Sequence, residues 1–71
     1  MNAETIRDLL RRQPFQPFEI RMSNVEAHQV HHPENGWVAG NRMIVYYPAT
    51  DRMVILSLLP AVSVEPLQVA A

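Results

Sequence analysis

The stretch that decides the fold is RMVILSLL, residues 52–59. It is too short to span a membrane and too rich in large apolar residues to be a surface loop, so it predicts the central strand of a small β-sheet. Successive side chains of a strand point to opposite faces of the sheet. Both faces of this strand are apolar, with Met53, Ile55 and Leu59 on one side and Val54, Leu56 and Leu58 on the other. Each face therefore needs a cover.

The segments on either side of this stretch also have strand character. MIVYY, residues 43–47, precedes it and is joined to it by a four-residue turn, residues 48–51. Pro60 interrupts the chain after it, and a last short strand is expected over residues 62–65. A strand broken by proline suits the edge of a sheet or a sharp corner, because proline has no backbone N–H to donate.

A β-hairpin is expected nearer the N-terminus. Phe18, Ile20 and Met22 alternate with polar residues, which is the pattern of a half-buried strand, and residues 25–32 have the weaker pattern of a second strand. The turn between the two strands contains no glycine. We therefore expect Asn24 to adopt a positive φ there, since asparagine tolerates that conformation better than most residues.

An amphipathic helix is predicted over about residues 3–13. Asn2 suits the N-cap position, and Pro14 ends the helix because the residue before a proline is pushed out of the helical region. Phe15 and Phe18, on either side of Pro17, are expected to anchor the helix to the sheet. The apolar side chains of the helix recur at positions i, i+3 and i+4 and form one narrow stripe: Ile6, Leu9 and Leu10.

One helix followed by five short strands predicts a mainly β fold, a small five-stranded and strongly bent barrel with the helix over one end. The whole chain, residues 1–71, forms a single small domain with its strands between about residues 18 and 66. The segment 37–41 has the weakest pattern. Its Trp37 either packs over the barrel mouth or presents a flat surface for stacking.

Composition narrows the classes of function. The chain has 71 residues, no cysteine and a formal net charge of −1, so it has no disulfide staple and no basic excess typical of a general polyanion binder. A core this small barely offsets the ordering entropy of about 1.5 kcal/mol per residue, which favours a homo-oligomer. No signal peptide and no membrane segment is recognisable, so the cytoplasm is the expected compartment.

The titratable side chains do not form a recognisable catalytic or metal pattern. His28, His31, His32 and Glu34 lie within seven residues, but on a strand His28 and His32 are about 13 Å apart and His31 faces the other way. No serine has a nucleophile-elbow context, and the two glycines cannot form a phosphate-binding loop. We expect no metal, no cofactor and no enzymatic activity.

Two resemblances to known families extend these expectations. IRDLLRRQPFQPFEIRMSN, residues 6–24, resembles the helix and first strand of the bacterial RNA chaperone Hfq, and residues 53–66 resemble its closing strands. This implies the Sm-like fold, a bent SH3-like barrel of five strands. Three phrases also resemble a group of short bacterial proteins of unknown function: PFQPFEIRMSN (14–24), HHPENGWV (31–38) and ILSLLPAVSVEPL (55–67).

The Sm-like resemblance implies RNA binding, but one motif departs from it. Sm-type proteins recognise uridine-rich RNA with a Lys-His or Arg-Gly signature in the turn before the last strand, and Leu59-Pro60 stands at that point here. The family's RNA pocket is therefore not carried over to these residues. Fold-level likeness alone is a weak basis for assigning function.

Two functions remain open on the sequence alone. The first is a non-enzymatic, self-assembling barrel that binds a polymer, with single-stranded RNA as the candidate ligand. The second is a protein-interaction or scaffold module that uses its strand edges and binds no nucleic acid. Asp8 is spaced to pair with two of the arginines, Arg11 and Arg12, and would partly neutralise them. The candidate binding residues are Arg7, Arg11, Arg12, Trp37, Tyr46 and Tyr47.

Overall fold

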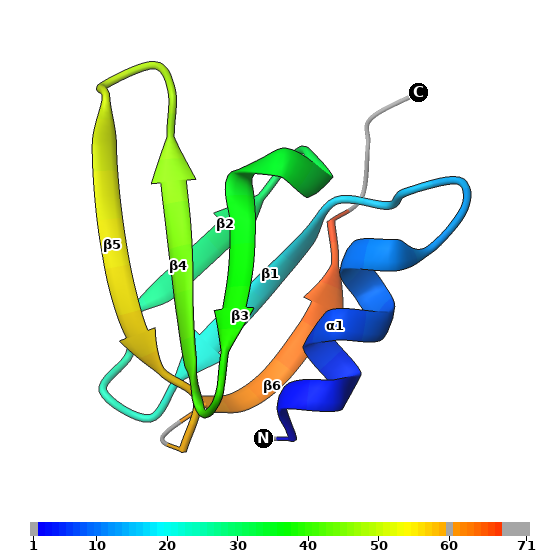
Figure 1. The fold of residues 1–71 in the computed structure, drawn as a ribbon. Helices are drawn as coiled ribbons and strands as arrows, with labels where there is room; N and C mark the ends of the chain where they lie inside the picture. The colour runs from blue at the N-terminus through cyan, green and yellow to red at the C-terminus, as the bar shows by residue number, and fades with distance from the viewer. Residues whose placement is uncertain (1, 60, 68–71) are drawn as a thin grey trace.

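The computed structural model describes residues 2–59 and 61–67, so the expected break at Pro60 lies outside the described residues. The described residues form one α-helix, one short 3-10 helix and six strands, and Figure 1 shows how these elements are arranged. The elements are α1 (Ala3–Arg11), β1 (Phe18–Met22), β2 (Ala27–Val30), the short 3-10 helix η1 (Pro33–Asn35), β3 (Gly36–Ala39), β4 (Arg42–Tyr47), β5 (Arg52–Ser57) and β6 (Ala61–Pro66).

The strands form two antiparallel three-stranded sheets, ordered β2-β1-β6 and β3-β4-β5. The predicted mainly β fold with one N-terminal helix is confirmed, and the described residues form six strands where the sequence predicted five. The strand that the sequence did not reveal is β3, in which Trp37 pairs with Ile44 of β4. It has only four residues and begins with a glycine, so its strand pattern is too short to recognise.

The apolar stretch 52–59 contains a strand, as predicted, but this strand is not a central one. β5 lies at the edge of its sheet and pairs only with β4 among the described strands. The central strands are β1 and β4. Apolar residues on both faces suggested a fully covered strand, and the structure instead leaves one of these faces exposed at Met53 and Ile55.

The helix begins where the sequence predicts. The side-chain oxygen of Asn2 accepts a hydrogen bond from the backbone N–H of Glu4 at 2.9 Å, which satisfies one of the free amides of the first turn. The helix ends at Arg11, two residues earlier than predicted, because Arg12 is already extended at ψ 136°. Ile6 is fully buried, and α1 packs against β3 beside Gly36, where a Cβ atom would lie 3.1 Å from Cδ2 of Leu10.

The hairpin of β1 and β2 turns differently from the prediction. Val25, not Asn24, has the positive φ, at +65°. The loop between Met22 and Glu26 has three residues, and in such loops the third residue adopts the left-handed conformation. Asn24 instead accepts a hydrogen bond from the backbone N–H of Glu26 with its side-chain oxygen, at 3.2 Å.

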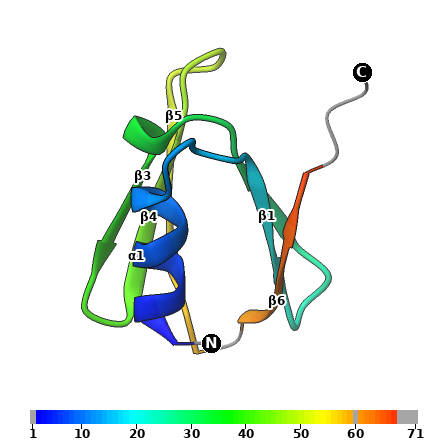
Figure 2. The ribbon, with the colours of Figure 1, turned by 90° about the vertical axis from the view of Figure 1, so that its right-hand side faces the viewer.

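The core lies between the two sheets and under the helix (Figure 2). Phe18, Ile20, Val45 and Leu56 are buried in this core, while Val54 is half-buried against the same cluster. The rings of Phe15 and Phe18 pack at a centroid distance of 6.1 Å, as expected for anchors of the connector. The other buried apolar side chains among the described residues are Ile6, Met22, Val30, Met43, Leu58 and Ala61.

Candidate binding surface

The face of β3-β4-β5 that points away from the core carries a row of apolar side chains. In the strand register Trp37 lies opposite Ile44, and Ile44 lies opposite Ile55. The next row on the same face pairs Tyr46 with Met53, because residues two apart on a strand share a face. We call these five side chains, Trp37, Ile44, Tyr46, Met53 and Ile55, the outer face.

The outer face is unusually exposed for side chains of this kind. Trp37 is 48% exposed, Met53 59% and Ile55 66%, whereas their neighbours on the inner face, such as Val45, are buried. Scattered apolar residues on a surface are ordinary, but a contiguous apolar patch marks an interaction site or an aggregation hazard. The outer face is contiguous across all three strands of its sheet.

Charges of opposite sign flank the outer face along the strand direction. Arg42 lies on the same face as Ile44, two residues before it on β4. At the other end, the carboxylate of Asp51 accepts a hydrogen bond from the Tyr46 hydroxyl at 2.9 Å. This hydrogen bond and the nearby negative charge raise the pKa of Tyr46, so the phenol stays protonated and remains the donor at neutral pH.

Tyr47 lies on the opposite face of β4 from Tyr46, in contact with the other sheet. Its hydroxyl oxygen is 3.0 Å from Nδ1 of His28 on β2, and Nε2 of the same imidazole lies 3.3 Å from a carboxylate oxygen of Glu26. Burial raises the pKa of Tyr47. These contacts join the two sheets at one end. Tyr47 is therefore a structural link between the sheets, and its side chain lies on the other face of β4 from Tyr46.

The three helix arginines lie apart from the outer face. Arg7 forms an ion pair with Glu4 one turn earlier. The pairs predicted from Asp8 to Arg11 and Arg12 are not formed, and neither arginine has an ion-pair partner among residues 2–59 and 61–67. The two residues are exposed at the C-terminal end of α1.

The six predicted binding residues thus separate into three places. The structure brings together only Trp37 and Tyr46, on the outer face. Sequence reasoning did not assign to this surface its other three members, Ile44, Met53 and Ile55, or its flanking charges, Arg42 and Asp51. The signal for Arg42 and Ile44 was present, since both alternate in step with Tyr46 along one strand.

The histidines do not gather around a common point. In the described part of the chain, no three histidine, aspartate or glutamate side chains lie close enough to hold one metal ion. His31 instead contacts the side chain of Gln29, with its Nε2 at 3.1 Å from the amide oxygen.

Comparison with known proteins gives no family or relative from which a role could be taken: no family model, curated protein or solved structure matches the chain. Among the described residues, no helix has both the length and the apolar character needed to cross a membrane. The functional interpretation therefore depends on the geometry of the outer face.

Proposed function

We propose that the protein is a non-enzymatic interaction module that assembles with a second copy of itself through the outer face. The observation that carries this proposal is the row Trp37, Ile44 and Ile55 across the sheet, in which Trp37 and Ile55 are exposed and Ile44 between them is half-buried. Covering it removes apolar surface from water, at about 25 cal/mol for each Å².

The size of the outer face fits a small interface between proteins. From their exposed fractions, its side chains offer on the order of 400 Å² of apolar surface, at the scale where a patch on a monomer is often functional. A standard interface buries about 800 Å² on each partner and surrounds an apolar centre with polar groups. Arg42 and Asp51 stand in the position of such a rim.

The charges favour a second copy as the partner. Two sheets that pack face to face can be related by a two-fold axis that runs across the strands, along the row of Trp37, Ile44 and Ile55. This rotation reverses the strand direction. The Arg42 end of one copy then lies over the Asp51 end of the other, so each dimer contains two complementary charge pairs.

A charge exchange tests this arrangement. Arg42→Glu and Asp51→Lys each place like charges together in the dimer and are expected to weaken association by about ten-fold or more. The double variant restores opposite charges and is expected to recover most of the affinity. Both residues are exposed, so circular dichroism should show a folded protein in each case. Equal weakening in the double variant would exclude the antiparallel arrangement.

We also propose that the fold is a form of the Sm-like, five-stranded bent sheet. If β2 and β3 are taken as one strand interrupted by η1, the strand order becomes β6, β1, β2/β3, β4, β5, which is that of a five-stranded bent sheet. The support for this interpretation is that β5 and β6 are both edge strands, as they are in a sheet that has not closed on itself. Pairing of β5 with β6 of another copy would then produce a ring in place of a dimer.

Single-stranded RNA is the second candidate partner. Trp37 and Tyr46 are diagonal neighbours on adjacent strands, at the spacing of about 7–8 Å at which side chains still interact, and Arg42 lies on the same face. Aromatic platforms of this kind stack bases. Trp37 is the only tryptophan, so quenching of its fluorescence by oligouridine reports binding directly. Affinity that falls linearly with the logarithm of salt concentration would favour RNA, and unchanged fluorescence at low salt would favour self-assembly alone.

A further inference from the structure

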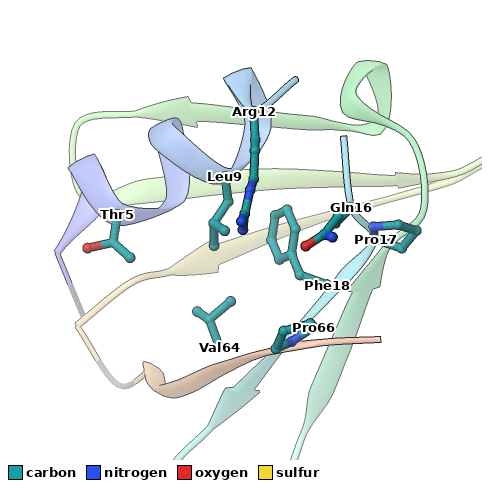
Figure 3. Close-up of a pocket in the computed structure, with 8 residues that line it drawn as sticks. All are labelled: Thr5, Leu9, Arg12, Gln16, Pro17, Phe18, Val64 and Pro66. Atoms are coloured by element: carbon teal, nitrogen blue, oxygen red, sulfur yellow. The ribbon is translucent and has the colours of Figure 1, made fainter. Parts of the chain in front are cut away.

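A second surface feature lies between the helix and the first sheet, and none of the outer-face residues lines it. α1 packs against β3, and a cavity of about 270 Å³ remains between the helix and strands β1 and β6. Figure 3 shows its lining in place. The lining residues come from α1, the connector, β1 and β6: Thr5, Leu9, Arg12, Gln16, Pro17, Phe18, Val64 and Pro66.

Most of the cavity wall is apolar. Leu9 and Phe18 approach from the helix and β1, and Val64 and Pro66 approach from β6 (Figure 3). An apolar cavity of about 150 Å³ in a protein core can hold benzene. The larger cavity here therefore has room for a short hydrocarbon chain, and it lies near the lower end of the range of small-molecule sites.

One cationic side chain, that of Arg12, lies beside this apolar wall. The side chain of Arg12 extends from the end of α1 towards Leu9 and Phe18 in Figure 3. Within residues 2–59 and 61–67 its guanidinium has neither an ion-pair partner nor a side-chain hydrogen bond. Asp8, one turn earlier on the helix, does not line this cavity but lines the adjoining hollow, which shares Thr5, Leu9 and Arg12 with it. The amide of Gln16 adds a neutral polar group beside Phe18 (Figure 3).

We propose that this cavity binds a small carboxylate with an apolar tail, such as a medium-chain fatty acid. The guanidinium of Arg12 donates two parallel hydrogen bonds to the carboxylate, for which its planar geometry is suited. The tail lies against Phe18 and Val64. A phosphate with two negative charges fits less well, since only one cationic side chain lines the cavity.

Titration with octanoate tests the proposal, followed by NMR shifts of the cavity residues. Two ligands separate the contributions: 1-octanol has the tail without the charge, and acetate has the charge without the tail. Octanoate is expected to bind at least about ten-fold more tightly than either, from one charge-assisted contact and from burial of the tail. Equal affinity for octanoate and 1-octanol would overturn the role of Arg12, and absence of octanoate binding would overturn the site.

Two pairs of variants locate the binding. Arg12→Gln is expected to reduce octanoate affinity to that of 1-octanol, while Arg11→Gln, the neighbouring arginine that does not line the cavity, should leave it unchanged. Val64→Phe fills the cavity and should abolish binding of both ligands. A fully retained affinity in either cavity variant would contradict the proposal. The site is independent of the outer face, so an Ile55→Glu protein should bind octanoate as the parent does.

Discussion

At the scale of single residues, Val25 has a backbone conformation that is unfavourable for a residue with a β-branched side chain. It has a φ of +65° and is 97% exposed, so no packing compensates for the close approach of its Cβ atom to the backbone. The left-handed region costs a non-glycine residue roughly 1–2 kcal/mol. The position is set by the three-residue loop that joins β1 and β2.

Val25→Gly is therefore expected to stabilise the protein. Relief of the steric cost exceeds the extra chain entropy of glycine, about 0.5–1 kcal/mol, and leaves a gain of about 0.5–1 kcal/mol in the free energy of unfolding. Denaturant melts measure this gain. Val25→Ala keeps a Cβ atom and should recover little of it, so an equal gain in both variants would place the effect elsewhere.

At the scale of elements, substitutions on the two faces of β5 test which face is buried. Leu56 is 5% exposed in the core, and the adjacent Ile55 points outwards. Leu56→Ala is expected to cost about 2–5 kcal/mol through lost burial and the cavity left behind. Ile55→Ala should cost well under about 1 kcal/mol in protein dilute enough to be monomeric. Urea melts compare the two, and a similar cost for both would mean that the faces are misassigned.

The sequence predicted the elements better than their positions in the sheets. Alternation in β1 and the cap at Asn2 are local signals, and both are confirmed. The place of β5 at an edge depends on which strand pairs with which, and periodicity contains no such information. Its exposed face, with Ile55, has the same pattern as a covered one.

The candidate surface was only half predictable for the same reason. Trp37 and Tyr46 were named from their chemistry, but their proximity follows from the register of β3 on β4. Tyr47 was grouped with Tyr46 because the two are adjacent in sequence, although adjacent strand residues face opposite ways. Asp51 joins the surface through a turn whose geometry, with a φ of +50°, residue patterns did not indicate.

At the scale of the whole molecule, the two sheets, arranged as in Figure 1, enclose one core, and no described element covers the outer face of β3-β4-β5. A chain of 71 residues has little stability to spare. Association through this face adds stability to the folded form by mass action. The thermal midpoint is therefore expected to rise with protein concentration, and a midpoint independent of concentration would argue against association.

Replacing one central residue of the outer face should separate association from folding. Ile55→Glu places a charge in the middle of the interface, where its desolvation opposes dimer formation, yet the side chain is exposed in the single chain. The variant is expected to be a folded monomer. Gln29→Glu adds the same charge at an exposed site on β2 and serves as the matched control, which should associate as the parent does.

Sedimentation equilibrium of the unmodified protein at micromolar concentration tests the central claim most directly. The proposal predicts a dimer, twice the chain mass of 8.1 kDa, that dissociates on dilution. A larger closed species would point to ring assembly through the strand edges of β5 and β6 in place of the outer face. A folded protein that stays at 8.1 kDa throughout would contradict self-assembly altogether.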